Sequence, residues 1–358
     1  MDDALFRARS LPVLQNRVFD SKDEALNSPV GDVRLVQDIT TGIIYNAEFR
    51  PELIVYDQNY QNEQGFSGIF SDHLERVLEK IQPYVRDRRV IEIGCGKGRF
   101  LNLMISKGID AFGIDPAYEG SDPRIRAEFF NESCDLRGDV VVLRHVLEHI
   151  PNPYNFLASI KETNKGGLIA IEVPSLEWIM EKNSWWDIFY EHVNYFRLSD
   201  FDAMFGKIHV KTTVFGGQYI LILADLDTLR PPSIGISGRV RFPEDFSSRI
   251  SRDIDRIKRA CAEQSRPCVI WGAASKGVIF SLFMQRSGSA PNAVFDINPR
   301  KQGRYLACSG IRVDDPSSVA PKLPDKTVVF VMNGNYLPEI IDQTERRFQY
   351  MVAEDVNV

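Results

Sequence analysis

The chain has 358 residues, of which 44% are hydrophobic and 26% charged, and its formal net charge is −6 at pH 7. This length accommodates two or three domains with a large buried core. The acidic balance argues against a nucleic-acid-binding protein, and no run of roughly 18 apolar residues predicts a membrane span. The acidic start at residues 1–5 argues against a signal peptide, and the five cysteines never form C-x-x-C. We therefore expect a cytoplasmic protein with reduced thiols.

The first part of the chain, to about residue 70, is polar and rich in turn signals. Short strand-like pieces stand at 33–36 and 42–45. The segment 56–64 has no apolar stripe and predicts a surface loop or lid. Apolar residues at helical spacing then predict a helix over 70–81.

The middle part of the chain, from about 85 to 225, alternates between strand and helix patterns. This alternation predicts an α/β fold, with a parallel sheet covered by helices on both faces. The last two strands lie close together in the sequence and favour an antiparallel hairpin. The expected strands are at 89–93, 110–114, 139–143, 168–173, 209–214 and 218–224.

A glycine-rich turn follows the first of these strands. Glu92 stands near the strand end, and Gly94, Gly96 and Gly98 follow before a helical pattern begins. Glycine permits a sharp turn and a close approach of the backbone to a ligand. The second strand ends in Asp115, about 20 residues after the first glycine, as in nucleoside-binding sites where a carboxylate binds ribose hydroxyls. The alternative is an ordinary turn between a strand and a helix.

The spacing of the glycines bears on the identity of the ligand. Dinucleotide binders show G-x-G-x-x-G, whereas this loop is G-x-G-x-G with Glu92 before it. An acid at this place repels a pyrophosphate but suits a cationic ligand such as S-adenosylmethionine. The run resembles the first motif of class I S-adenosylmethionine-dependent methyltransferases, an acid-x-G-x-G-x-G sequence. The resemblance implies that Glu92 lies near the methionine ammonium and Asp115 near the ribose, with Gly94, Gly96 and Gly98 in the cofactor loop.

The strand at 139–143 leads into the sequence R-H-V-L-E-H-I-P at 144–151. In class I methyltransferases of this type a V-L-E-H-[IV]-P loop lies beside the cofactor, which implies cofactor contacts for His145 and His149. An alternative for His149 is a hydrogen-bonded residue that holds the loop in shape. The spacing of the two histidines also suits zinc, but no third ligand is evident nearby, so we expect no metal site.

The segment 185–196 crowds aromatic side chains among two acids, a histidine and an asparagine, without clean helical or strand periodicity. This mixture predicts the wall of a substrate pocket, and a buried aromatic corner is the alternative. The candidate substrate contacts in this segment are Trp186, Asn194 and Tyr195.

The sequence E-V-P at 172–174, the aromatic stretch and Y-E-H-V-N-Y-F at 190–196 together resemble the sugar C-methyltransferase family. That family acts on nucleotide-linked 4-keto-6-deoxysugars. It combines a small N-terminal zinc domain, a class I methyltransferase core with a seven-stranded sheet, and a C-terminal Rossmann-like domain. The C-terminal part matches through G-A-A-S-K-G at 272–277 and K-Q-G-R-Y-L at 301–306.

The resemblance implies three parts and a set of roles. The parts are a small N-terminal substrate or lid domain at 1–70, the S-adenosylmethionine-binding domain at 71–227, and the C-terminal domain at 228–358. His192 takes the role of the general base, with Glu191 and Tyr190 orienting it or holding an enolate oxygen. In the C-terminal domain, Lys276 stands beside a phosphate, or else the domain is a scaffold that closes the substrate cleft.

The chain departs from this family in two places. Residues 1–75 contain no cysteine, so the N-terminal zinc ligands are missing. The sequence F-G-G-Q at 215–218 replaces the family's H-G-G-S, which makes Phe215 and Gln218 candidate substrate contacts and leaves carbon and oxygen methylation both open.

The substrate expected from these features is a small molecule, either a sugar or a nucleotide sugar, and a homo-oligomer is compatible with the sequence. Two other functions stay open. One is an O-methyltransferase acting on a small molecule other than a sugar. The other is a non-catalytic binding module with a methyltransferase fold.

Overall fold

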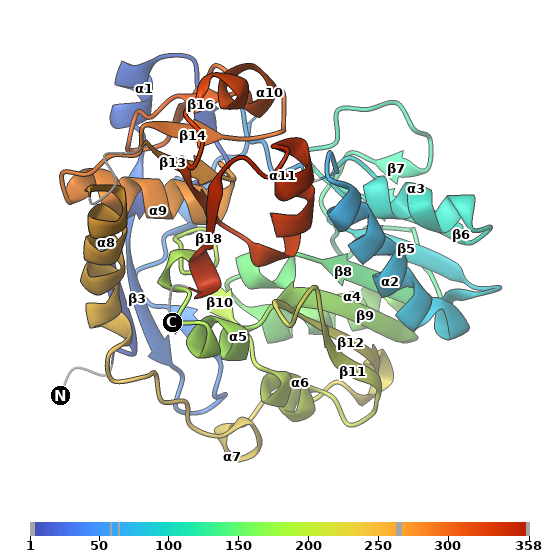
Figure 1. The fold of residues 1–358 in the computed structure, drawn as a ribbon. Helices are drawn as coiled ribbons and strands as arrows, with labels where there is room; N and C mark the ends of the chain where they lie inside the picture. Colours follow the sequence, from blue (N-terminus) through green and yellow to red (C-terminus); the bar gives the residue numbers. More distant parts are fainter. Residues whose placement is uncertain (1–3, 58, 64, 263–266, 356–358) are drawn as a thin grey trace.

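The computed structural model describes residues 4–57, 59–63, 65–262 and 267–355 (Figure 1). The central sheet of this part of the chain has seven strands, and β12 runs antiparallel to both of its neighbours. The predicted hairpin is therefore confirmed, together with the α/β fold. In spatial order the strands are β11 (Ile208–Val214), β12 (Tyr219–Asp225), β9 (Leu168–Pro174), β8 (Val140–Arg144), β5 (Arg89–Ile93), β6 (Asp110–Ile114) and β7 (Ile125–Arg126).

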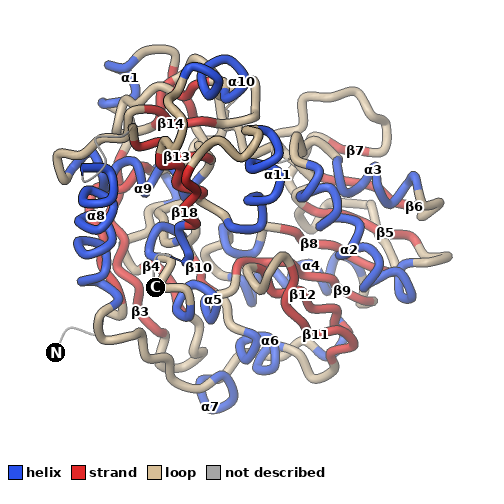
Figure 2. Tube along the Cα trace, viewed as in Figure 1, coloured by secondary structure: helices blue, strands red, loops and turns tan. Residues whose placement is uncertain are grey.

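Both faces of the central sheet are buried, because successive side chains of a strand point to opposite faces. On β8, Val140 and Val142 pack into one hydrophobic cluster, and Val141 and Leu143 pack into another. Figure 2 shows α2 and α3 beside β5 and β6. The helices of this part are α2 (Gly68–Val85), α3 (Arg99–Ser106), α4 (Pro153–Asn164), α5 (Leu176–Glu181) and α6 (Leu198–Met204).

The helix expected over 70–81 is α2, which extends beyond the prediction at both ends. It begins after Ser67, whose hydroxyl accepts a hydrogen bond from the backbone N–H of Phe70. Such a cap satisfies one of the free N–H groups at a helix start. No described helix is long and apolar enough to cross a membrane.

The N-terminal strands form an antiparallel sheet that β10, from the middle of the chain, completes at one edge. A separate two-stranded ladder joins β2 (Val18–Phe19) to β15 (Tyr305–Leu306). Backbone pairing thus connects the N-terminal part to both other parts, and the boundary at residue 70 stays a prediction. The larger sheet contains β1 (Phe6–Pro12), β3 (Val30–Gln37), β4 (Ile44–Asn46) and β10 (Asn194–Tyr195), and α1 (Lys22–Leu26) follows β2.

The C-terminal part contains a five-stranded parallel sheet. A charged helix, α8 (Phe246–Ala262), precedes this sheet in the chain. The ring of Phe246 meets Phe6 of β1 at a centroid distance of 5.6 Å, so α8 covers the N-terminal sheet. The strands are β16 (Val313–Asp314), β14 (Ala293–Phe295), β13 (Cys268–Trp271), β17 (Val328–Val331) and β18 (Gln349–Val352), and the other helices are α7 (Ile234–Ser237), α9 (Ser275–Arg286), α10 (Pro316–Val319) and α11 (Leu337–Gln343).

Candidate active site

A cavity of about 830 Å³ lies beyond the carboxyl ends of β5, β6 and β8. Ligands of open α/β sheets bind at this edge, where the connections diverge to the two sides. All three parts of the chain line the cavity. Its wall includes the glycine loop, the turn after β8, residues 56–57 and 60–63, and the first turn of α9.

Glu92 lies in the cavity wall at the end of β5 and is only 2% exposed. Burial raises the pKa of its carboxyl to about 8, although the Arg144 guanidinium acts in the opposite direction. Within the described structure, its Oε2 has no hydrogen-bond partner. A buried carboxylate oxygen without a partner is costly. The site therefore fits a ligand that presents a cation or a hydrogen-bond donor to Glu92.

The glycine loop leaves open space beside Gly96. This residue has φ +55°, and a Cβ built on it would meet no atom within 4 Å. A ligand can therefore approach the backbone there. Gly98 differs, because it begins α3 and a Cβ on it would lie 2.6 Å from Cδ1 of Ile125. Gly94 and Gly96 line the cavity and Gly98 does not, so the expected cofactor contact of Gly98 is corrected to a role in the turn.

Asp115 follows β6 and lines the same end of the cavity. Its Oδ2 accepts a hydrogen bond from the N–H of Gly96 at 2.7 Å, and its Oδ1 accepts one from the N–H of Ala117 at 2.8 Å. A carboxylate oxygen can accept more than one hydrogen bond. The half-buried side chain can therefore still bind ligand hydroxyls.

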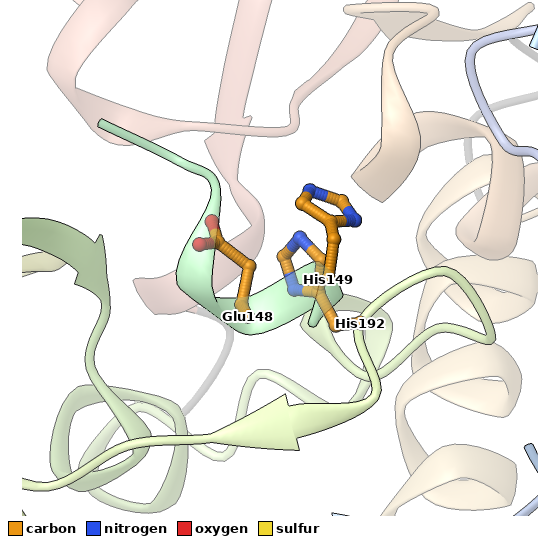
Figure 3. A group of neighbouring side chains, drawn as sticks. All are labelled: Glu148, His149 and His192. Carbon is orange, nitrogen blue, oxygen red and sulfur yellow. The ribbon is translucent and has the colours of Figure 1, made fainter. Parts of the chain in front are cut away.

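A histidine pair forms another part of the cavity wall. His149 lies in the short helical turn η2 (Leu147–His149), and His192 lies in the adjacent loop (Figure 3). The two rings meet edge to face, with centroids 4.9 Å apart. The Nδ1–H of His149 donates to the backbone carbonyl of Glu191 at 3.1 Å. This bond leaves Nε2 as the ring nitrogen with a lone pair.

His192 is 9% exposed and lines the cavity. Burial, followed by the influence of His149, holds the pKa of its imidazole well below the usual value. Neither ring nitrogen has a hydrogen-bond partner among the described residues. The side chain is therefore a neutral imidazole whose free lone pair can accept a proton.

Glu191 connects this wall to the loop that the sequence predicts over 56–64. Its Oε1 accepts hydrogen bonds from the hydroxyls of Tyr56, at 3.1 Å, and Tyr60. Burial raises the pKa of the Glu191 carboxyl, while His149 opposes the shift. The described residues of the loop thus line the cavity, and Glu191 attaches them to the histidine-bearing segment.

Comparison with known families and proteins identifies the chemistry of this cavity. A methyltransferase-domain model matches residues 62–208, and a C-methyltransferase C-terminal domain model matches residues 241–351. The chain is an S-adenosylmethionine-dependent methyltransferase. It is 27% identical over 296 residues to the C-methyltransferase NovU of Streptomyces niveus, an alignment that spans 72% of this chain and 69% of NovU.

Two solved structures match part of this chain. A SAM-dependent methyltransferase from Archaeoglobus fulgidus is 18% identical, with a TM-score of 0.34 over 45% of this chain and 95% of that one. Human N-acetylserotonin methyltransferase in complex with SAM is 17% identical, with a TM-score of 0.37 over 45% of this chain and 54% of that one. The cofactor of the methyltransferase is S-adenosylmethionine.

The cavity brings together most of the predicted site residues of the methyltransferase. Those in its wall are Glu92, Gly94, Gly96, Asp115, His145, His149, Glu191, His192, Gln218 and Lys276. The predicted residues outside its wall, besides Gly98, are Trp186, Tyr190, Asn194, Tyr195 and Phe215. All five of these come from aromatic or aromatic-flanked segments.

Tyr190 is turned toward the N-terminal sheet. Its hydroxyl accepts a hydrogen bond from the N–H of Arg50 at 2.7 Å, and its ring stacks on Phe49 with centroids 5.5 Å apart. The side chain is fully buried in these contacts. The structure therefore does not bring Tyr190 to His192 or to the cavity, and the expected role in orienting the base is corrected.

The other three predicted contacts of this segment support the wall from behind. Asn194 donates a hydrogen bond to the carbonyl of Ile150 at 2.6 Å and so holds the turn that carries His149. The hydroxyl of Tyr195 donates to the carbonyl of Phe189 at 3.0 Å. Trp186 packs in the core against Trp185 and Phe280. The expected substrate contacts of Trp186, Asn194 and Tyr195 are corrected accordingly.

Phe215 also lies outside the cavity wall. Its ring stacks on Tyr219 at 5.4 Å and meets His73 at 4.7 Å, so the expected substrate contact is corrected to a packing role. Gln218 does line the cavity, where its Oε1 accepts a hydrogen bond from Asn333 at 2.9 Å.

Lys276 lies in the wall with its charge already balanced. Its Nζ is 2.9 Å from Oδ2 of Asp187 and 3.6 Å from Oε1 of Glu354, and it lies 4.5 Å from the centre of a Trp178 ring. Burial raises the pKa of both carboxyls, and the lysine opposes the shift. An ion pair of this kind connects the start of α9 to the aromatic segment.

A buried ionic group fixes the turn after β8. Arg144 donates to Oε2 of Glu172 at 2.6 Å, and His73 of α2 donates to Oε1 of Glu172 at 2.6 Å. Burial opposes ionisation of Glu172, but Arg144 and His73 hold the pKa of its carboxyl well below the usual value. The group therefore joins α2, β8 and β9 directly behind the cavity.

The sequence reasoning missed several residues of the wall. Glu148 is part of the V-L-E-H-I-P motif, which predicts no role for it, and the sequence predicts Tyr56 and Tyr60 only as part of a loop or lid. Glu128 and Phe129 line the cavity from the connection after β7. That strand has two residues, too few to produce a recognisable pattern, so only the fold reveals them.

Proposed function

We propose that the chain is a C-methyltransferase that acts on a nucleotide-linked keto sugar. The observation that carries the proposal is the imidazole of His192, which lines the cavity without a hydrogen-bond partner among the described residues. The glycine loop after β5 and a similar turn after β13 line the same cavity. The similarity to NovU and to the C-methyltransferase C-terminal domain favours carbon over oxygen as the acceptor.

The cofactor half of the cavity accounts for the methyl donor. S-adenosylmethionine supplies an electrophilic methyl group on a positively charged sulfur. The unpartnered oxygen of Glu92 suits its ammonium group, the open space at Gly96 suits close contact with the backbone, and Asp115 suits the ribose hydroxyls. These three residues therefore hold and orient the donor toward the rest of the cavity.

The turn between β13 and α9 supports a nucleotide at the opposite wall. A Cβ on Gly277 would lie 1.7 Å from the carbonyl oxygen of Gly272, so the helix can pack this closely on the turn only with glycine there. Asp296, after β14, accepts a hydrogen bond from the N–H of Ala273 at 3.0 Å. Asp115 has the same relation to its glycine loop, and this recurrence favours a nucleoside group at both turns.

The phosphates of such a nucleotide fit the start of α9. No side chain of the described residues caps this helix, whose first N–H groups favour an anion. Arg300 is exposed and lines the same region of the cavity. Because two carboxylates engage Lys276, we assign the phosphate contact to the helix start and Arg300 in place of Lys276.

The chemistry follows from the lone pair of His192. The imidazole removes a proton from the carbon next to a carbonyl. The electron pair of the broken C–H bond forms the C=C bond of an enolate, and the π pair of the carbonyl moves to its oxygen. The enolate carbon then bonds to the methyl carbon as the bond between methyl and sulfur breaks, with its electron pair remaining on sulfur. Holding the two carbons in line supplies much of the rate acceleration.

A transfer assay tests the proposal. The full chain is incubated with S-adenosylmethionine carrying a labelled methyl group and with matched nucleotide sugars that have either a keto or a hydroxyl group at one position. Mass spectrometry and NMR then locate the label. Label on the carbon next to the ketone supports the proposal. Label on oxygen, label only on molecules other than sugars, or cofactor binding without any transfer would contradict it.

A further inference from the structure

We propose that Glu148, His149 and His192 form a binding site for a divalent transition-metal ion. Each side chain offers one ligand atom, and these atoms all lie within 4.8 Å of one another. Glu148 and His149 come from one helical turn, and His192 comes from the neighbouring loop (Figure 3). All three line the cavity. The sequence reveals no third ligand beside the His145–His149 pair. The fold brings Glu148 and His192 to His149 instead, and His145 is not part of this group.

The state of Glu148 is the second observation that points to an ion. The residue is 1% exposed, and neither carboxylate oxygen has a hydrogen-bond partner among the described residues. The one described basic side chain within 4.0 Å is His145, whose Nδ1 lies 3.4 Å from Oε1. Burying a carboxylate in this state costs several kcal/mol or more. A bound cation would offset that cost.

The two histidines are arranged as metal ligands usually are. The Nδ1–H of His149 donates to the carbonyl of Glu191, and such a bond to a carbonyl oxygen orients metal-binding imidazoles and leaves Nε2 for the ion. His192 makes no hydrogen bond within the described structure that would have to be broken. Two imidazoles and one carboxylate suit Zn²⁺ or Co²⁺ better than Mg²⁺ or Ca²⁺, which prefer oxygen ligands.

The ligand atoms lie no farther than 4.8 Å from one another, and this upper limit is slightly wider than a bound ion requires. A point at the centre of a triangle with 4.8 Å sides lies about 2.8 Å from each corner, whereas Zn–N and Zn–O bonds are about 2.0–2.2 Å long. Each ligand atom must therefore move inward by less than about 1 Å, which side-chain rotation provides. The cavity side of the group leaves room for a further ligand.

An ion at this place would compete with proton removal, because it would occupy the lone pair of His192. This consequence, unlike the metal site itself, rests on the proposed function. We therefore expect Co²⁺ or Zn²⁺ to inhibit methyl transfer, and a chelator to restore it.

Titration of the full chain with Co²⁺ tests the site, with visible absorption and calorimetry as the readouts. We expect one ion per chain and a spectrum without a thiolate charge-transfer band, because none of the five cysteines belongs to the group. Glu148→Gln and His192→Gln should each weaken Co²⁺ binding at least about tenfold. The matched control is His209→Gln, which changes a histidine of β11 that packs on Tyr84 and does not line the cavity, and it should leave the Co²⁺ affinity within about twofold.

Saturable Co²⁺ binding that Glu148→Gln and His192→Gln weaken, and that the control variant leaves unchanged, supports the site. Absence of binding at millimolar Co²⁺, or an equal loss in His209→Gln, would overturn it. Thermal unfolding and S-adenosylmethionine binding show whether each variant is folded, and a variant that fails these checks is replaced by Glu148→Asp or His192→Asn. Stimulation of transfer by the bound ion would contradict the base role of His192 and leave the metal site standing. If the parent protein binds no metal and His192→Gln loses methyl transfer, the base role of His192 is supported and the metal site is contradicted.

Discussion

The backbone N–H of Gly96 donates a hydrogen bond to Oδ2 of Asp115 at 2.7 Å. This bond joins the glycine loop after β5 to the end of β6, so the two elements that would contact a nucleoside are held in one geometry before the ligand arrives. Ala273 and Asp296 repeat the relation in the C-terminal sheet at 3.0 Å. The recurrence divides the cavity into two ends that can be tested separately.

Asp115→Asn should weaken S-adenosylmethionine binding about tenfold to a hundredfold, because a charge-assisted hydrogen bond contributes roughly 1.5–3 kcal/mol. Calorimetric titration measures the change. The matched control is Asp296→Asn, which should leave the cofactor affinity unchanged and weaken binding of a nucleotide sugar. A loss of cofactor affinity in both variants would show that the two ends are not independent.

The carboxyl of Glu92, with a pKa of about 8, should make cofactor binding depend on pH. The cationic ligand favours the ionised carboxylate, so the affinity should rise as the pH increases toward 8. In the absence of ligand, the stability of the folded state depends on pH in the opposite direction. The folded state binds a proton more tightly than the unfolded state, whose pKa is near 4.5, so stability falls as the pH rises between these values.

Both effects are measured by titration calorimetry and thermal unfolding across this pH range. Glu92→Gln removes the titrating group and should flatten both profiles, apart from the ionisation of the ligand itself. If the variant keeps the pH dependence of the parent protein, another group is responsible.

His192→Gln should slow the exchange of the substrate's α-proton with deuterated solvent by about 10²–10⁴-fold. NMR of a nucleotide-linked keto sugar follows the exchange and needs no methyl transfer. Tyr190→Phe is the matched control, because its hydroxyl contacts Arg50 outside the cavity, and it should keep the exchange rate within about threefold. Equal losses in the two variants would contradict the assignment of the base.

Glu172→Gln should lower the free energy of unfolding by about 3 kcal/mol, because it leaves the charge of Arg144 buried without its counter-ion. Urea unfolding measures the change. The exposed pair Arg89–Asp110 offers the comparison, where Asp110→Asn should cost less than about 1 kcal/mol. A small effect at Glu172 would mean that water or a rearranged neighbour compensates Arg144.

The sequence predicted the central sheet well, since the six expected strands correspond to β5, β6, β8, β9, β11 and β12 with ends within a residue of the prediction. Strand identity depends on local apolar runs and glycine turns, which the sequence displays directly. It also predicted that Asp115 lies beside the glycine loop, because parallel strands bring their carboxyl ends to one edge.

The sequence could not predict which aromatic side chains face the cavity. Tyr190 and His192 are two residues apart, yet the tyrosine is buried against the N-terminal sheet and the histidine lines the cavity. An irregular segment has no period from which direction can be inferred. The same reason accounts for Trp186 and Phe215, whose aromatic character suits a core and a pocket equally well.

Short-range patterns of apolar residues, glycines and acids are enough to predict the methyltransferase fold and a cofactor end of the site. The tertiary structure brings Glu148 close to His192, and it brings Tyr56 and Tyr60 to the adjacent Glu191, from distant segments of the chain. It likewise showed that Lys276 is neutralised by two acids far from it in the chain. Contacts between remote segments depend on packing, and local sequence patterns carry no record of them.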